Sequence, residues 1–421
     1  MSGLMLIAAL AAQTTTDAAA TSPPPSTEAA SKTVKQGEST YVDLEGGVGY
    51  STNPILSLGS NNGAGFARIS AHAVHTKVTE RTTTVLSGYA QSLFYTKRLG
   101  AEQSFDVNGR HDAAVSEKLH IFFDGDVSYD KGGQLDTRII GVPNVPLLPG
   151  SIVPPSLLPA GGDFLTVTGR TYRADANIGA QWSLSAREFL DLSTGIEHTV
   201  LKTGGFETRY TTIPASIGYQ RQLNERTTIG ARVLGQFTDY STTVIGTLHS
   251  VQVITPELTA QLMLSPTLTL SGDTGVSFSA VDDGVQTRHS TGAAGDVNLC
   301  SSSERSQFCA RASIQQQAAT SAGPAKVVSL GVDYSRQLSA NDAIQFSLAA
   351  ERYSNPIIVV SGPSFTHATY IRAAADYSRH IGHRLYGGVE LAARKLKRTG
   401  PDPDADISGS LFIRYRFGSV Q

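Results

Sequence analysis

Pairs of neighbouring polar residues are the first places to look for catalysis in this sequence. The pairs that combine a base, an acid or a hydroxyl are His111-Asp112, His249-Ser250, His289-Ser290 and Asp282-Asp283. A hydrolase site needs a nucleophile and a base that converge in space. Adjacent residues of a β-strand point to opposite faces of the sheet, so neighbours in a strand cannot converge. We therefore expect ordinary polar surface groups and no enzyme.

The cysteines and glycines predict structure rather than a bound cofactor. Cys300 and Cys309 lie nine positions apart without histidine partners, which makes a poor metal site. In an oxidising compartment the same spacing favours a disulfide, here within a predicted long loop. Gly125, Gly132 and Gly133 do not lie between a strand and a helix, where a phosphate-binding loop would be found. We expect neither a metal nor a cofactor.

A set of charged residues recurs opposite the apolar face of each predicted strand. Its members are Asp43, Glu45, Asp124, Asp126, Arg173, Asp175, Arg232, Arg372, Asp376, Glu390, Arg394, Arg414 and Arg416. Charges persist inside a membrane protein when they are hydrated or paired. One interpretation is a water-filled conduit with charged walls, and the alternative is a salt-bridged interior that conducts little. The two signs are nearly balanced in this set, so it predicts no ion selectivity.

The elements that must position these charges are β-strands. Apolar and polar residues alternate from Tyr41 to Tyr50, from Leu119 to Tyr129 and from Ile407 to Phe417, and in many segments between. Such alternation predicts strands with one apolar face. The strands of soluble sheets average about five or six residues, whereas these run for roughly 10–15, the length that crosses a membrane at a tilt.

The connections between these strands are of two kinds. Short polar turns are predicted at Glu80-Arg81, Ser116-Glu117, Leu184-Ser185, Asn224-Glu225, Ser265-Pro266, Ala340-Asn341 and Gly382-His383. Longer loops are predicted at Ser51–Ala64, Asp130–Asp163, Ser241–Leu248, Asp282–Ala325, Asn355–Ser364 and Thr399–Asp404. Short turns on one side and long loops on the other are typical of outer-membrane barrels. With Ser313–Gln317 taken as loop, this pattern predicts an all-β, transmembrane antiparallel barrel of about sixteen strands, with short periplasmic turns and long extracellular loops.

The composition agrees with a barrel and excludes several other classes. Charged residues are 17% of the chain, hydrophobic residues 40%, and the mean hydropathy is -0.11. No stretch approaches the roughly 20 apolar residues of a membrane-spanning helix. The net charge of -2 and the absence of a basic block give no reason to expect nucleic acid as a partner.

The chain divides into three predicted parts. Residues 1–12 hold a short apolar run and an Ala-x-Ala pattern, which indicate a signal peptide. Residues 13–39 are rich in Thr, Ala, Ser and Pro and predict a disordered periplasmic lead. Residues 40–421 form the barrel. Within it, Asp130–Asp163 is rich in proline and apolar residues, so it could constrict the lumen, cover the outer mouth or bind a partner.

Two segments carry a resemblance to known proteins. The closing run Leu411-Phe-Ile-Arg-Tyr-Arg-Phe417 resembles the last strand of bacterial outer-membrane barrels, which implies that Tyr415 and Phe417 are read by the barrel-assembly machinery. The opening run Leu44-Glu-Gly-Gly-Val-Gly-Tyr-Ser-Thr-Asn-Pro54 looks like the first strand of the beta-barrel porin 2 type. That resemblance implies exopolysaccharide synthesis and export proteins as neighbours, and polysaccharide as a partner.

These observations predict an integral barrel of the Gram-negative outer membrane, in contact with its lipid. The expected function is a channel, or porin, for polar solutes, with a link to exopolysaccharide export that the resemblance alone implies. The alternative is a non-conducting barrel that serves as a structural or assembly partner. A hydrolase carried by the barrel is the least expected function, because no serine, histidine and acidic residue lie at the same depth along the predicted strands.

Overall fold

The protein is described by a computed structural model that covers residues 37–56, 63–96, 100–131, 169–203, 206–242, 248–303, 305–317, 325–354, 367–398 and 402–419. No helix in these ranges is long and apolar enough to cross a membrane. The expected signal peptide lies outside the described residues. So do the Pro-rich segment beyond Lys131 and the expected periplasmic lead, except for its residues 37–39, which belong to the first strand.

Every regular element of the described chain is a β-strand. In chain order they are β1 (Gly37–Ser51), β2 (Ala64–Val78), β3 (Thr82–Tyr95), β4 (Ala101–Ala114), β5 (Leu119–Lys131), β6 (Arg170–Ser185), β7 (Glu188–Thr203), β8 (Phe206–Asn224), β9 (Thr227–Thr242), β10 (Ser250–Ser265), β11 (Leu268–Asp282), β12 (Thr287–Ser302), β13 (Ser306–Gln317), β14 (Ala325–Gln337), β15 (Asp342–Ser354), β16 (His367–Gly382), β17 (Leu385–Arg398) and β18 (Asp406–Ser419).

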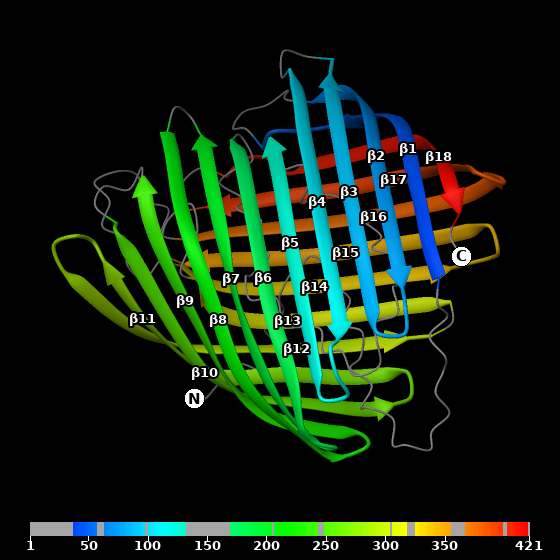
Figure 1. Ribbon diagram of the computed structural model, residues 1–421. Helices are drawn as coiled ribbons and strands as arrows, with labels where there is room; N and C mark the ends of the chain where they lie inside the picture. The colour runs from blue at the N-terminus through cyan, green and yellow to red at the C-terminus, as the bar shows by residue number, and fades with distance from the viewer. Residues whose placement is uncertain are drawn as a thin grey trace, which may run out of the picture.

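The strands form one closed antiparallel barrel. Each strand pairs with the next along the chain, and β1 pairs with β18 from Thr40 opposite Ser419 to Ser51 opposite Ser408. Closure leaves no open sheet edge, which is the condition for a sheet to span lipid. Figure 1 shows that the strands are tilted, so that those of the near wall cross those of the far wall steeply.

The barrel has 18 strands, so the predicted number of about sixteen is wrong. The difference lies in the segment Asp282–Ala325, which the sequence led us to read as the longest loop. It contains β12 and β13, which pair as a hairpin from Gly295 opposite Ile314 to Ser302 opposite Gln307. Their turn is closed by the backbone N–H of Ser303, which donates to the carbonyl of Ser306. A polar run around this turn looks like loop in the sequence although it only reverses the chain.

The two ends of the barrel differ in their connections. The joints at the end where β1 begins and β18 ends span two to four residues, for example 186–187 between β6 and β7. The longest connections, such as 132–169 between β5 and β6, are all at the other end. In outer-membrane barrels the short turns face the periplasm. Both ends of the paired sheet therefore lie on the periplasmic side.

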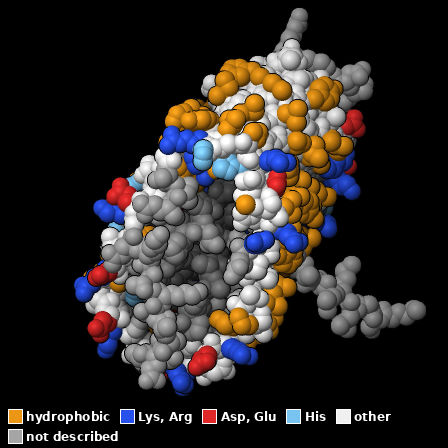
Figure 2. Space-filling model, turned by 90° about the vertical axis from the view of Figure 1, so that its right-hand side faces the viewer, with side chains coloured by type: hydrophobic (Ala, Val, Ile, Leu, Met, Phe, Trp, Pro, Cys, Tyr) orange, Lys and Arg blue, Asp and Glu red, His pale blue; other side chains and the backbone are white. Residues whose placement is uncertain are grey.

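The outer face of the barrel is apolar. Side chains such as Ile69 (64% exposed), Leu258 (66%) and Leu411 (61%) alternate with inward-facing polar groups, and Figure 2 shows hydrophobic side chains gathered along the outer wall. Aromatic groups stand on the same face near the short turns, among them Trp182, Tyr219 and Tyr415. A lipid-facing apolar band with aromatic residues at its border is the outer surface expected for a transmembrane barrel.

Cys300 and Cys309 are joined by a disulfide between two strands rather than within a loop. The residues are direct cross-strand partners in the β12–β13 hairpin. Their bond thus reinforces a pairing that the backbone hydrogen bonds already make.

Replacing both cysteines by serine should leave the barrel folded and lower its free energy of unfolding by about 2–4 kcal/mol. The measurement is urea unfolding of the refolded protein, followed by the fluorescence of Trp182, which faces outward. Reductant should destabilise the wild type by the same amount and leave the double variant unaffected. A variant that cannot refold would contradict a merely reinforcing role.

Candidate functional site

The inner wall of the barrel is the candidate functional site. All thirteen charged residues predicted to line the lumen lie on the face opposite the exposed apolar side chains. They are Asp43 and Glu45 on β1, Asp124 and Asp126 on β5, Arg173 and Asp175 on β6, Arg232 on β9, Arg372 and Asp376 on β16, Glu390 and Arg394 on β17, and Arg414 and Arg416 on β18. The predicted insertion residues, Tyr415 and Phe417, face outward beside the closing seam.

Ion pairs join the first strand to the last. Glu45 lies directly opposite Arg414, and the guanidinium Nη2 of Arg414 is 2.7 Å from Glu45 Oε2. Asp43 lies opposite Arg416, which donates through Nε (2.7 Å) and Nη2 (2.6 Å) to its two carboxylate oxygens. Such two-point pairs are the stronger kind of charged hydrogen bond. These residues close the barrel, and their charges are already neutralised.

Arg68 extends this network to neighbouring strands, although it was missing from the predicted set. Its guanidinium is 2.9 Å from Glu45 and 2.6 Å from Glu390. Arg68 stands between Ala67 and Ile69 on β2, and only 6% of it is exposed. The alternation of β2 would have placed it inside. No sequence pattern reveals its partners, because Glu390 is 322 positions away.

Arg394 and Asp406 form a buried ion pair near the end of the barrel that carries the long connections. Arg394 donates to Asp406 Oδ2 from Nη2 (2.8 Å) and Nε (3.2 Å), and also donates to the carbonyl of Pro54. The other carboxylate oxygen of Asp406 accepts from the Ser51 hydroxyl (2.6 Å) and the Asn53 backbone N–H (3.0 Å). Arg394 is 5% exposed and Asp406 only 1%. This arginine therefore ties three segments together and does not present its charge to the lumen.

Across the barrel, arginines are outnumbered by the carboxylates around them. Arg232 lies 2.7 Å from Glu257 and 2.8 Å from Asp273, two residues that the sequence-based set omitted. Asp296 stands beside Asp273, and its backbone N–H donates to the Asp273 carboxylate (2.9 Å). In the neighbouring wall, Arg173 lies 3.4 Å from Asp175 and 3.6 Å from Glu197.

An acidic stretch runs along β4 to β6, where the inward carboxylates outnumber the two inward arginines, Arg110 and Arg173. Asp124 accepts a hydrogen bond from the Asn177 amide (2.9 Å). Asp126 lies between Asp106 and Asp175. Like charges this close raise the local negative potential, which attracts cations from the lumen.

Carboxylates exceed guanidinium groups on the inner face of the described strands as a whole. The inward carboxylates are Asp43, Glu45, Glu102, Asp106, Asp112, Asp124, Asp126, Asp130, Asp175, Asp191, Glu197, Glu257, Asp273, Asp296, Asp333, Glu351, Asp376, Glu390 and Asp406. The inward arginines are Arg68, Arg110, Arg173, Arg232, Arg288, Arg311, Arg372, Arg394, Arg414 and Arg416. Half of these arginines belong to β2, β16, β17 and β18. The near balance of the sequence-based set therefore does not hold for this inner face.

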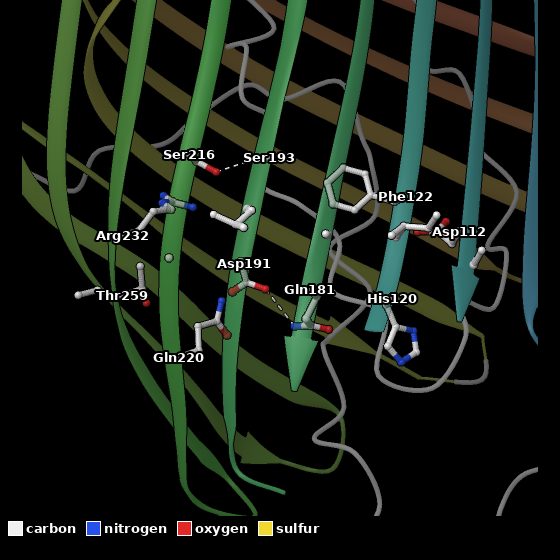
Figure 3. A pocket seen from close by; sticks show the side chains of 16 residues that line it. Asp112, His120, Phe122, Gln181, Asp191, Ser193, Ser216, Gln220, Arg232 and Thr259 are labelled. Atoms are coloured by element: carbon white, nitrogen blue, oxygen red, sulfur yellow. Dashed lines mark hydrogen bonds between the residues drawn. The ribbon is translucent and has the colours of Figure 1, made fainter. Parts of the chain in front are cut away.

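A recess of about 60 Å³ opens in the inner wall over β4 to β10. Figure 3 shows its polar lining: Asp112, His120, Gln181, Asp191, Ser193, Ser216, Gln220, Arg232 and Thr259, with the ring of Phe122. The Gln181 amide donates to Asp191 Oδ1 (3.1 Å). The other carboxylate oxygen, Oδ2, is buried and has no hydrogen-bond partner among the described residues, and the same holds for His120 Nδ1. Sequence reasoning missed Asp191 because one acidic residue between Leu190 and Leu192 carries no motif.

The polar pairs His111-Asp112 and Asp282-Asp283, which were expected to be ordinary polar residues, have separate structural partners. His111 is exposed and hydrogen-bonds Thr84, whereas Asp112 is buried and paired with Arg110. Asp283 accepts from the backbone N–H groups of Val285 and Gln286 in the turn before β12, which holds the pKa of its carboxyl below the usual range. Nor do three or more metal-ligating side chains gather anywhere in the part of the chain described here.

Comparisons with known proteins find likeness in the fold and none in the sequence. No family model matches the sequence. No curated protein matches it. Among solved structures, the FrpB iron transporter from Neisseria meningitidis (F3-3 variant) is 11% identical with a TM-score of 0.42, over 87% of this chain and 62% of the transporter. The chain thus spans less than two thirds of the length of that protein.

Two further structures cover most of both chains. The siderophore receptor PirA from Acinetobacter baumannii is 8% identical, with a TM-score of 0.42 over 91% of this chain and 81% of that one. OccK2 (OpdF) from Pseudomonas aeruginosa, solved with glucuronate, is 7% identical, with a TM-score of 0.44 over 91% and 98%. At such identities and scores these likenesses concern the fold alone. The proposed membership in the beta-barrel porin 2 type has no support from a family model.

The architecture settles where the protein resides. An 18-stranded antiparallel barrel with a closed sheet, an apolar outer band and short turns at one end is an outer-membrane protein. The localisation predicted from the sequence is confirmed.

Proposed function

We propose that the protein is a channel through which small polar solutes diffuse across the outer membrane. One observation carries the proposal: the inner face of an 18-stranded barrel is lined by charged and polar side chains. Barrels of about 16–18 strands enclose an aqueous passage, whereas those of about eight are filled by their own side chains. Fixed charges and the width of the lumen would set which solutes pass.

A non-conducting barrel is the second candidate, and the inner salt bridges favour it. Arg394, Asp406 and the seam between β1 and β18 are paired and buried, as expected of groups that only stabilise a barrel. The acidic stretch of β4 to β6 is different, because its inward carboxylates outnumber its two inward arginines, Arg110 and Arg173. The link to exopolysaccharide export rests on the opening sequence run alone, and we leave it out of the proposal.

Single-channel recording decides between the two candidates. The protein is refolded in detergent, its folding is verified by heat-modifiable migration, and it is added to a planar lipid bilayer. We expect discrete, steady current steps. A variant lacking residues Gly141–Pro159, recorded in the same way, controls for a blocked mouth. Silence from both folded proteins would overturn the channel and leave the structural role.

A further inference from the structure

The recess over β4 to β10 has the features of a binding site for part of a small solute. Its volume is about 60 Å³, and by the same measure one water needs roughly 10–15 Å³. It therefore has room for on the order of four to six non-hydrogen atoms. The recess opens on the inner wall, along the path that a solute would take under the proposed function (Figure 3).

The charge of the recess is negative. Arg110 and Asp112 neutralise each other through two hydrogen bonds of 2.8 Å. Arg232 is shared between two carboxylates, Glu257 and Asp273. Asp191 lies within reach of the charge of Arg232 but makes no ion pair with it, and its hydrogen-bond partner is the Gln181 amide, on one of its two oxygens. The guanidinium groups at this site are thus already committed to carboxylates, and the carboxylate of Asp191 is not.

The free groups of the recess accept hydrogen bonds. Asp191 Oδ2 is buried with no partner in the described chain, and a buried carboxylate oxygen without a donor costs free energy. His120 Nδ1 is also buried without a partner there, and it accepts a hydrogen bond when the ring proton is on Nε2. The ring of Phe122 completes the lining, and the guanidinium carbon of Arg110 lies 5.9 Å from its centroid, so a cation is tolerated beside it. A ligand that brings several N–H donors and a positive charge matches all of these groups.

We propose that this recess binds the ammonium end of small amines, with Asp191 as the carboxylate that receives it. The proposal deepens the channel function, because it names the class of solute that the inner wall would retain. An alcohol of the same length would supply fewer donors and no charge. An anion would meet the carboxylates of Asp112 and Asp191 without a free guanidinium to offset them.

Three four-carbon solutes test this inference on the unchanged protein. Putrescine, 1,4-butanediol and succinate have similar length and carry positive, zero and negative charge. Each is titrated calorimetrically into the folded barrel in a non-ionic detergent, at a pH where carboxyl groups are ionised. We expect saturable binding of putrescine and none of the other two. Absence of putrescine binding, or equal binding of the diol, would overturn the proposal.

Matched variants then locate the site. Asp191→Asn should weaken putrescine binding at least tenfold, because a hydrogen bond to a charged group contributes about 1.5–3 kcal/mol and about 1.4 kcal/mol corresponds to a factor of ten. Glu188→Gln removes the same charge from the same strand, but Glu188 accepts from the outward-facing Tyr219 (2.9 Å). The Glu188→Gln variant should bind putrescine with the same affinity as the wild type. Equal affinities for Asp191→Asn and wild type would overturn the assignment.

The titration does not depend on current, so the two proposals can fail separately. Binding without conductance would remove the channel and keep the recess. Conductance without putrescine binding would keep the channel and remove the amine site. If Asp191→Asn does not fold, the comparison of the three solutes on the wild type still decides the class of ligand.

Discussion

Replacing Arg394 by methionine should destabilise the barrel by about 3–5 kcal/mol, because it leaves a buried carboxylate without its counter-charge. Asp406 would keep only the Ser51 hydroxyl and the Asn53 N–H as donors. Arg394 also holds the carbonyl of Pro54, so the chain after β1 would lose its anchor to β17. The measurement is the urea dependence of Trp182 fluorescence for the refolded protein in lipid vesicles.

A matched arginine on the neighbouring strand provides the control. Arg379 lies 3.8 Å from Asp342 and its side chain is 64% exposed, so Arg379→Met should cost about 0–1 kcal/mol. Adding Asp406→Asn to the Arg394→Met variant should restore part of the lost unfolding free energy, since it removes the buried carboxylate that has no counter-charge. Equal losses of unfolding free energy in the two arginine variants would show that the buried pair of Arg394 and Asp406 stabilises the barrel no more than an exposed pair does.

The current through the barrel should be cation-selective. Inward carboxylates exceed inward arginines along the described strands, and in the acidic stretch of β4 to β6 they outnumber Arg110 and Arg173. In a salt gradient the reversal potential should therefore favour K⁺ over Cl⁻. Selectivity should be strong in dilute salt and fade in concentrated salt, because the screening length falls from about 30 Å at about 0.01 M to about 3 Å at about 1 M.

Neutralising the acidic stretch tests the origin of this selectivity. The double variant Asp124→Asn, Asp126→Asn should shift the reversal potential toward zero without lowering the conductance in concentrated salt. Asp342→Asn is the control, since this carboxylate is on the outward face of β15, where it accepts from the outward-facing Tyr377 (2.7 Å). Anion selectivity of the wild type, or equal shifts in both variants, would contradict the assignment to the inner wall.

Most of the strands could be predicted from alternation because their outer face meets lipid. Every second residue must then be apolar, as at Leu411, Ile413 and Tyr415 on β18. The hairpin of β12 and β13 escaped prediction because its residues depart from this rule. Gly292, Ala294 and Gly295 give β12 a weak pattern, and the serines around the turn look like loop. Periodicity detects a strand by the difference in polarity between its two faces, and in β12 and β13 this difference is small.

The inner face was predictable, but its pairing was not. Alternation alone assigns Asp43, Arg232 and Arg414 to the inside. Which charges neutralise one another depends on register between strands, as for Arg68 and Glu390, and no single-strand pattern contains that information. The recess was missed for the same reason, since Gln181 and Asp191 meet across β6 and β7 only after the strands align.

The order of charges at the closing seam also acts as a check on assembly. In the native alignment Asp43 meets Arg416 and Glu45 meets Arg414. Sliding β18 by two residues preserves which side chains face inward, but in one direction Asp43 would meet Gly418, and in the other Glu45 would meet Phe412. Either misalignment leaves one ion pair across the seam where the native register has two. The order of charges along β1 and β18 thus favours one shear of the closed barrel over its nearest alternatives.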